Sequence, residues 1–336
     1  MIDKTANQAE LLYNRLTKRR KHLGKWARRT GTSAFRLYDR DIPEIPLVLD
    51  LYRNNASGGS PTGDAVSGAI YKRPYEKEAH EEAAWLLAMK ASASQALNIP
   101  EDCIFLKERR RIRSRQESGG QYGKMSGQNF YMDVSERDLL FRVNLSDYLD
   151  TGLFLDARKK RAIIRAEAEG KRFLNLFSYT CSLSTAAAKG GASQVDSVDL
   201  SKTYLDWGKI NFALNGLHER DGFNFIRSDV SQFLTYADGK GLRWDIIILD
   251  PPSFSNSKRM RGNLDIKRDY QDLIGRCLSL LSPGGTLWFS SNARGFGLES
   301  TDFPGYSLKD MGPSLVDEDF RGKRVPMCYK FVKTIM

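Results

Sequence analysis

Cysteine and histidine are scarce in this chain. Its 336 residues include four cysteines, far apart and with no CxxC pair, and three histidines. Zinc sites need several such ligands at short spacing, so we expect no metal site. Isolated cysteines in a chain of this size are typical of a reducing compartment, and we therefore expect a cytoplasmic protein.

Long apolar runs are also missing. No stretch approaches the roughly 18 apolar residues that a membrane span needs, and the opening residues, Met1 to Lys4, lack the apolar segment of a secretory signal. We expect no membrane association. A hydrophobic content of 41% is that of a globular protein, and 336 residues suit two domains.

Acidic residues are absent from Leu11 to Leu37, where nine Lys and Arg residues lie, and the whole chain has a net charge of +11. Further basic clusters occupy 107–115 and 258–261. A single cluster is often just a solvated face, but three of them, interleaved with aromatic residues, favour a nucleic-acid phosphate backbone as partner. The side chains predicted to contact RNA are Arg19, Arg20, Lys25, Arg28, Arg29, Arg109, Arg110, Arg111, Lys258 and Arg259.

Residues 1–150 are predicted to form an α+β domain that binds RNA and begins with a basic helix. Leucines at helical spacing indicate that helix, and Ala, Leu and Met with early acids indicate a second one. The Gly- and Ser-rich segment 54–68 is predicted to be an exposed loop. Helices are expected at 5–29 and 76–97, strands at 35–38, 47–52, 69–72 and 103–107, and a hairpin from 130–134 and 139–145.

Residues 151–336 alternate strand and helix patterns, which predicts a parallel sheet with helices on both faces. A final strand at 328–333 is expected at an edge of that sheet. Strands are predicted at 172–177, 194–199, 223–227, 245–249 and 285–290, and helices at 183–189, 202–215, 230–237 and 270–281.

The apolar run Ile246 to Leu249 ends in Asp250-Pro251-Pro252-Ser253 and Phe254. Such a run is typical of a buried parallel strand, and the prolines stop it abruptly. Ligands bind at the carboxyl ends of parallel strands, and a rigid turn rich in acceptors suits a nucleobase. We predict Asp250, Pro251, Pro252 and Phe254 as the catalytic pocket. A proline-stopped strand without chemistry, with Phe254 in the core, is the competing interpretation.

Asp199 and Asp229 also follow predicted strands. A carboxylate after the second strand can accept both hydroxyls of a ribose, and the next acid can accept from an adenine amine. Each acid alone is more often a helix N-cap, but three acids at one sheet edge favour a nucleoside site.

The first turn of this half, Asn175 to Ser182, contains no glycine, whereas turns that bind pyrophosphate need glycine for a close backbone approach. This disfavours nicotinamide and nucleoside triphosphate cofactors. S-adenosylmethionine, a nucleoside without phosphate, fits better, with Ser178 and Thr180 next to its amino-acid portion.

Four long motifs, Asn175–Thr180, Val198–Ser201, Asp250–Met260 and Thr151–Asp156, closely resemble those of class I ribosomal RNA methyltransferases. The nearest similarity is to the RlmK half of the bifunctional RlmKL enzymes, which forms 7-methylguanosine in 23S rRNA, and it extends to 14–39 at the N-terminus. It implies a Rossmann-like class I domain with a mostly parallel, seven-stranded sheet. It also implies S-adenosyl-L-methionine as methyl donor, S-adenosyl-L-homocysteine as product, and 23S rRNA or a large-subunit assembly intermediate as partner.

The resemblance assigns cofactor contacts residue by residue. This chain carries Cys181 where the family carries glycine, and the RlmL half, with its second activity, is not expected here. The implied cofactor-binding residues are Phe154, Asp156, Asn175, Phe177, Ser178, Thr180, Asp199, Leu200, Ser201, Asp229, Val230 and Asp250.

Guanine N7 has an in-plane lone pair and no proton, so its methylation needs alignment with the methyl carbon rather than a general base. Methylation at cytosine C5 would need a thiolate, and neither the Asp250 loop nor 290–292 contains cysteine. Methylation of an exocyclic amine of guanine or adenine is the main alternative. A non-catalytic RNA-binding or ribosome-assembly factor on the same fold is another.

Overall fold

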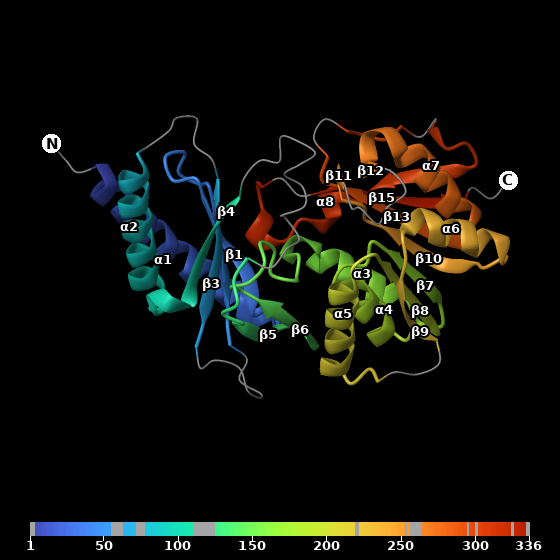
Figure 1. Ribbon diagram of the computed structural model, residues 1–336, viewed down its shortest axis with the longest axis horizontal. Coiled ribbons are helices and arrows are strands. Elements are labelled where there is room, and N and C mark those ends of the chain that lie inside the picture. Colours follow the sequence, from blue (N-terminus) through green and yellow to red (C-terminus); the bar gives the residue numbers. More distant parts are fainter. Residues whose placement is uncertain are drawn as a thin grey trace. The chain divides into compact units, whose positions relative to one another are not determined.

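Figure 1 shows the computed structural model, with its helices and strands numbered in chain order. Contacts divide the chain into two units, Met1–Leu155 with Glu318–Lys323, and Asp156–Asp317 with Arg324–Met336. The structure describes residues 4–54, 63–71, 78–109, 125–218, 222–252, 254–255, 264–293, 296–299, 302–323 and 326–333, without the side chains of 254 and 255.

The first unit is built on a four-stranded sheet of order β1-β2-β3-β4, accompanied by a separate hairpin. Strands β1, β2 and β3 pair antiparallel, whereas β3 and β4 pair in parallel because helix α2 connects them. The strands are β1 (Ala34–Asp39), β2 (Leu47–Tyr52), β3 (Ala65–Tyr71) and β4 (Ile104–Arg109), and the hairpin is β5 (Tyr131–Glu136) with β6 (Leu139–Asn144).

Helices α1 (Lys4–Thr30) and α2 (Ala79–Leu97) run side by side against this sheet (Figure 1). Leu12, Leu16 and Leu23 recur at helical spacing and are fully buried in a core shared with the sheet. Helix α2 ends at Asn98, whose left-handed conformation (φ 50°) allows its N–H to bond the carbonyl of Ser94. The predicted α+β unit with a basic N-terminal helix is confirmed.

Strand β3 begins at Ala65, inside the segment predicted to be a loop. The sequence signal was misleading because small residues here serve close packing in the sheet. A Cβ on Gly68 would lie 2.7 Å from side-chain atoms of both Leu49 and Leu106, so any larger residue would require these leucines to shift. Much of the preceding predicted loop, 55–62, lies outside the described residues.

The second unit contains a seven-stranded sheet of order β14-β15-β13-β10-β7-β8-β9. The five strands from β13 to β9 are parallel, β15 pairs antiparallel with β13, and β14 pairs antiparallel with β15. The strand order reverses between β7 and β10, which is where such folds bind ligands. The strands are β7 (Arg172–Leu176), β8 (Gln194–Asp199), β9 (Phe223–Arg227), β10 (Trp244–Leu249), β13 (Leu281–Ser291), β14 (Tyr306–Asp310) and β15 (Met327–Lys333).

Helices cover both faces of this sheet, and each face has its own apolar core. Figure 1 shows α3, α4 and α5 on one face and α6 and α7 on the other. This arrangement confirms the predicted Rossmann-like fold. The helices are α3 (Arg158–Glu167), α4 (Ser182–Lys189), α5 (Lys202–Leu214), α6 (Val230–Gly239), α7 (Ile266–Ser279) and the short α8 (Gly312–Leu315).

Several elements of this unit differ from the prediction. Strand β15 was expected at the edge but lies between β13 and β14, and β14 had not been predicted because its alternating pattern is mostly polar and exposed. Helix α3 was also missed. It buries Arg158, Lys160 and Arg161, so its inward face does not resemble an apolar stripe. No helix in the described ranges combines the length and apolarity needed to cross a membrane.

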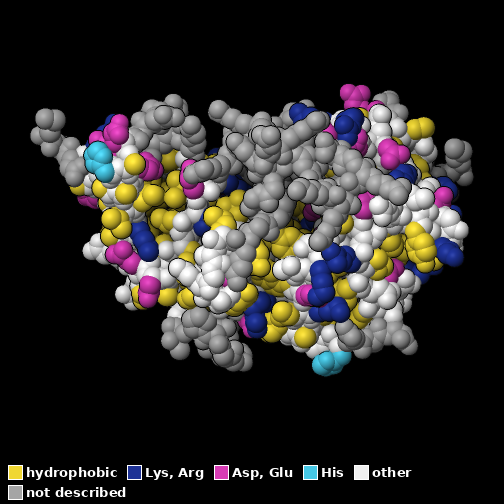
Figure 2. Space-filling model, viewed as in Figure 1, with side chains coloured by type: hydrophobic (Ala, Val, Ile, Leu, Met, Phe, Trp, Pro, Cys, Tyr) yellow, Lys and Arg dark blue, Asp and Glu magenta, His cyan; other side chains and the backbone are white. Residues whose placement is uncertain are grey.

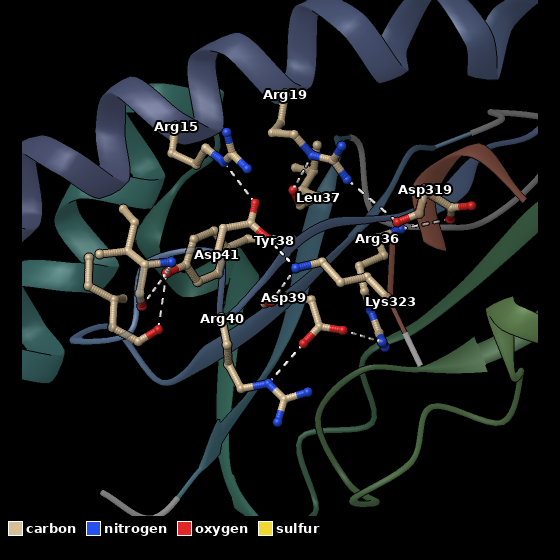
Figure 3. Close-up of polar contacts among 12 residues, drawn as sticks. Arg15, Arg19, Arg36, Leu37, Tyr38, Asp39, Arg40, Asp41, Asp319 and Lys323 are labelled. Carbon is tan, nitrogen blue, oxygen red and sulfur yellow. Dashed lines mark hydrogen bonds and ion pairs between the residues drawn. The ribbon is translucent and has the colours of Figure 1, made fainter. Parts of the chain in front are cut away.

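Residues 318–323 return from the C-terminal half and become part of the first unit (Figure 3). Lys323 Nζ and Arg15 Nε lie 2.5 Å and 2.7 Å from the carboxylate of Asp41, and the N–H of Arg36 donates to Asp319 at 3.0 Å. Burial would raise the pKa of Asp41, but the hydrogen bonds from Lys323 and Arg15 outweigh it and hold the pKa below its usual value. These bonds fix the returning segment on β1 and α1.

Replacing Asp41 by Asn should therefore destabilise the first unit at neutral pH, by about 1–2 kcal/mol for partly exposed charged partners. A depressed carboxylate pKa contributes stability above its unfolded-state value, and that contribution is lost as pH falls below about 4. Chemical denaturation at pH 7 and pH 3 should show a large difference between wild type and variant at pH 7 and a small one at pH 3. Glu44→Gln, at an exposed neighbouring carboxylate, is the matched control; equal losses in both variants would contradict the assignment.

Candidate functional site

The carboxyl ends of β7, β8 and β10 meet where the strand order reverses. Asn175, near the end of β7, is buried and donates to Ser184 Oγ on α4 at 2.9 Å, and Ser197 of β8 bonds the same oxygen at 2.8 Å. This polar network fixes the start of α4 relative to both strands. The Asn175 side chain thus holds the turn that follows it and is only 2% exposed.

The turn after β7 has an unusual backbone. Among the described residues, seven non-glycine residues have positive φ, and three of them alternate here: Phe177 (57°), Tyr179 (50°) and Cys181 (59°). Each costs about 1 kcal/mol relative to glycine. Strain of this kind is concentrated at binding sites, where the surrounding fold maintains it. Ser178 and Thr180, between them, have buried side chains.

Helix α4 begins directly after this turn. Its N-cap is Cys181, which makes no side-chain capping bond, whereas Ser, Thr, Asp or Asn would normally fill this position. The partial positive charge of the helix start therefore lies at the sheet edge without a capping oxygen, an arrangement that favours an anionic ligand group.

Asp199 ends β8 and faces the same turn. Its two oxygens accept N–H groups from Tyr179 (2.9 Å) and Ser201 (2.8 Å), which fixes the carboxylate while leaving further lone pairs for a ligand. Burial raises the pKa of Asp199 above its usual value, against the opposing effect of these amide bonds. A buried carboxylate held in this way is suited to accept hydroxyl groups of a sugar.

Cys181 is fully buried and its side chain points toward α5. An added Cβ on Gly208 of α5 would lie 2.5 Å from Cys181 Sγ and 2.8 Å from its Cβ. Burial raises the pKa of the Cys181 thiol to about 12, so the thiol is neutral and inert. The substitution of cysteine for glycine in the turn is thus accommodated by a glycine on the neighbouring helix.

Asp229 follows β9 and caps α6, where its Oδ1 accepts the N–H of Gln232 at 3.1 Å. Ser201 caps α5 in the same way through Tyr204. Asp229 and Ser201 therefore both have the N-capping role that is usual for Asp and Ser. Leu200 is half-buried, Val230 is buried, Asp156 is half-buried, and Phe154, in the first unit, is 47% exposed.

Asp250 follows β10 directly, with Pro251 buried and Pro252 half-buried. The backbone continues into a short ribbon in which β11 (Phe254–Ser255) pairs with β12 (Leu264–Asp265). Asp250 Oδ2 lies 3.1 Å from Nζ of Lys160, a residue of α3 that sequence reasoning missed. The available signal was a lysine four residues, about one helical turn, after Asp156, and it is weak. The predicted stacking role of Phe254 concerns a side chain outside the described ones.

The residues predicted to bind RNA fall into three groups. Arg19 donates to backbone carbonyls of Leu37 and Asp319, and Arg109 pairs with Asp150 at 3.0 Å, so both are engaged within the first unit. Lys25, Arg28 and Arg29 are exposed on α1, and Arg20 is half-buried there. Arg110, Arg111, Lys258 and Arg259 lie outside the described residues. Figure 2 also shows Lys and Arg side chains gathered over the region of α3 and α5.

A doubly wound sheet with acids at successive strand ends and a strained, uncapped turn defines a nucleoside-binding α/β protein. In the described part of the chain, no group of three or more His, Cys, Asp or Glu residues could hold a metal ion. The chain belongs to the S-adenosylmethionine-dependent methyltransferases, whose family model matches residues 80–306.

Two relatives illustrate the similarity. The chain is 43% identical over 317 residues to ribosomal RNA large subunit methyltransferase K of Neisseria meningitidis, covering 94% of this chain and 85% of that protein. It is 43% identical over 312 residues to ribosomal RNA large subunit methyltransferase K/L of Stutzerimonas stutzeri, covering 93% of this chain and 40% of that protein. The chain thus spans about two fifths of the length of the K/L relative, and the resemblance read from the motifs is confirmed.

Solved structures agree on the fold. A Streptococcus mutans protein described as a SAM-dependent methyltransferase superposes with a TM-score of 0.72 at 23% identity, covering 96% of this chain and 81% of that one. The crystal structure of SMU.776, complexed with SAH, gives a TM-score of 0.72 at 24% identity with the same coverage. At this identity the likeness concerns the fold alone.

The packing of Cys181 on α5 predicts a compensating pair. Gly208→Ala should destabilise the protein by about 1–3 kcal/mol through overpacking. Adding Cys181→Gly should recover most of that loss, because it removes the clashing side chain and relieves the left-handed strain at the same position. Thermal or urea unfolding of the two single variants and the double variant measures the coupling.

Gly275→Ala is the control, because glycine 275 also lies within a helix, α7, but a Cβ there meets nothing within 4 Å. It should be neutral or stabilising by about 0.4–1 kcal/mol. Additive effects of the two substitutions, at positions 181 and 208, would show that their side chains do not compete for one space.

Proposed function

We propose that this protein transfers a methyl group from S-adenosylmethionine to N7 of a guanine in 23S ribosomal RNA. The observation that carries the proposal is the Asp250-Pro251-Pro252 turn at the reversal of strand order, in a chain that is 43% identical to a ribosomal RNA large subunit methyltransferase K. The substrate is either the naked RNA or an assembling large subunit. The polar partners of this substrate would be the basic residues of the first unit.

The residues at the strand ends fit the methyl donor in chemical type. Asp199 would accept the ribose hydroxyls, and the uncapped start of α4 with the turn 177–181 would face the carboxylate of the methionine portion. Asp229, Val230, Leu200 and Ser201 would line the adenine and ribose. Phe154 and Asp156 would cover the ligand, and Asn175, through Ser184, would hold the turn in place.

When bound, S-adenosylmethionine supplies a methyl group activated by a sulfonium. The protein's own task is to hold guanine N7 in line and to exclude water. Pro251 and Pro252 lack N–H donors and have restricted backbones, so their turn presents rigid walls to the base. Asp250 supplies a carboxylate where positive charge develops on the base. Phe254 would stack on the base.

Methylation of 23S rRNA in vitro followed by nucleoside mass spectrometry tests this proposal. We expect 7-methylguanosine, and we expect Asp199→Ala to abolish product because it removes the acceptor for the ribose. Isothermal titration should show binding of S-adenosylhomocysteine to wild type and at least about 10-fold weaker binding to Asp199→Ala, as expected for the loss of about 1.4 kcal/mol or more.

The products distinguish the alternatives. N2-methylguanosine or N6-methyladenosine in place of 7-methylguanosine would identify an exocyclic-amine methyltransferase. Cofactor binding without product on naked RNA, but with product on a large-subunit precursor, would identify the assembling particle as substrate. Absence of cofactor binding would favour a non-catalytic assembly factor and refute the proposal.

The exposed face of α1 is the best-defined candidate for the RNA-binding surface. Lys18, Lys21, Lys25, Arg28 and Arg29 recur every three or four residues, all are exposed, and within the described ranges none has an ion-pair partner. Side chains at this spacing lie on one side of a helix, where they form a strip of positive charge suited to successive phosphates. Arg19 and Arg109, by contrast, are held by partners within the protein.

Replacing Lys25, Arg28 and Arg29 together by Ala should weaken RNA binding and reduce its salt dependence. Each lost phosphate contact lowers the slope of log affinity against log salt by about 0.7–0.9, so the triple variant should lose about 2 units or more. Filter binding or fluorescence anisotropy across a salt series measures this slope. The affinity for S-adenosylhomocysteine should be unchanged.

The matched control replaces three exposed lysines of the second unit, Lys171, Lys240 and Lys309, by Ala. It removes the same charge from the protein as a whole. Equal losses of RNA affinity in both triple variants would mean that net charge, rather than the α1 strip, governs binding.

A further inference from the structure

Lys160 is a buried cation beside the predicted methyl-transfer pocket. Its side chain extends from α3 and is 5% exposed. Its ammonium donates to Asp250 Oδ2 at 3.1 Å and to Ser290 Oγ. A lysine is rarely buried unless it is paired, so these two contacts account for its position.

The two partners of Lys160 lie at equivalent heights on neighbouring strands. Strands β10 and β13 are parallel with Leu249 opposite Phe289, so Asp250 and Ser290 are the next residues of each strand. The ammonium therefore bridges the carboxyl ends of β10 and β13, on the side of Asp250 away from β7 and the turn 177–181.

The surroundings keep this lysine charged. Burial lowers the pKa of an ammonium, but the nearby carboxylates of Asp250 and Asp156 outweigh it, and the pKa of Lys160 lies above its usual value. Cys328 of β15 also faces Lys160, and burial raises the pKa of that thiol, so the thiol is neutral. Among the described residues, Asp250 thus supplies the one full negative charge in hydrogen-bonding contact with the ammonium.

The two carboxylate oxygens of Asp250 differ in their contacts. Oδ2 is bound by Lys160, whereas Oδ1 has no hydrogen-bond partner among the described residues. The Asp250 side chain is 41% exposed although its partner is 5% exposed, so the accessible part of the carboxylate is the part turned away from Lys160.

We propose that Lys160 is a positioning residue for methyl transfer: it fixes Asp250 as an ionised hydrogen-bond acceptor whose free oxygen receives an N–H of the target base. The inference rests on the proposed function. The ammonium holds one carboxylate oxygen and so fixes the orientation of the side chain, which presents the other oxygen of Asp250 as a hydrogen-bond acceptor.

This arrangement matches the electron balance of N7 methylation. The N7 lone pair forms the new N–C bond, the C–S bond breaks, and sulfur keeps the electron pair as a thioether, so no proton leaves the base. Positive charge moves onto the guanine, which makes its ring N–H groups stronger donors. A carboxylate oxygen bonded to such a group binds the transition state more tightly than the ground state.

The competing explanation is a purely structural ion pair that joins the ends of β10 and β13. Both explanations predict some loss of stability when Lys160 is replaced. They differ in the kinetics: a positioning role lowers kcat and makes the effects of Lys160 and Asp250 variants non-additive, whereas a purely structural ion pair lowers only the melting temperature.

Lys160→Met, Lys160→Arg and Lys160→Gln are compared with the control Lys159→Met, on the same helix, where the Lys159 ammonium bonds the carbonyl of Val316. We expect Lys160→Met and Lys160→Gln to lower kcat by about 10- to 100-fold, the range found when groups that orient a reacting residue are lost. The affinity for S-adenosylhomocysteine should stay within about twofold of wild type. Lys160→Arg, which keeps the charge, should recover part of the rate.

The combination of Lys160 and Asp250 variants gives a second readout. Asp250→Asn should lower kcat as much as Lys160→Met, and the double variant should lose little more, because the two residues act as one unit.

Unchanged kcat in a folded Lys160→Met or Lys160→Gln protein, or fully additive losses in the double variant, would overturn the inference. If Lys160→Met does not fold, Lys160→Gln and Lys160→Arg decide through the same two readouts. Failure of the proposed function is seen separately, as the absence of 7-methylguanosine with the wild-type protein.

Discussion

The parallel pairing of β10 with both β7 and β13 is the constraint on which the rest of the structure depends. It brings the carboxyl ends of three strands to one edge of the sheet at the reversal of strand order. The same pairing sets Asp250 beside Ser290, so that one lysine from α3 reaches both. The Ile246–Leu249 run is buried on both faces, and its burial fixes this register far more firmly than the polar contacts alone would do.

The turn between β7 and α4 combines a strained backbone with a side chain that needs extra room on a neighbouring helix. Non-glycine residues adopt left-handed conformations there because the surrounding network, from Asn175 through Ser184 to Ser197, fixes both ends of the turn. Gly208 on α5 provides the room that the Cys181 side chain requires. Other nucleotide-binding folds have a glycine-rich turn at this place. Here the turn consists of larger residues, and the neighbouring helix must carry a glycine to leave room for one of them.

The excess of basic residues is divided between structure and surface. Arg15, Arg19 and Lys323 bind acceptors within the first unit, where Arg19 and Lys323 link residues 318–323 to the rest of it, and Lys160 is buried in the second. Buried cations of this kind are costly to desolvate and therefore occur with matched acceptors. The charge available to an RNA partner is consequently smaller than the net charge of +11 indicates, and on α1 it is concentrated on one exposed face.

Local pattern and composition by themselves determined most elements and the class of ligand. The alternation after residue 150 gave the strand positions to within a few residues, since apolar runs and helix caps are short-range signals, and the glycine-free turn with its acids at the strand ends indicated a nucleoside without phosphate. Tertiary structure alone decided the interior place of β15, the burial of α3 and the Lys160–Asp250 pair, the contact of Cys181 with Gly208, and the return of residues 318–323 to the first unit. These features join residues that are tens to hundreds of positions apart. Local periodicity does not indicate which distant charge or cavity a side chain will contact.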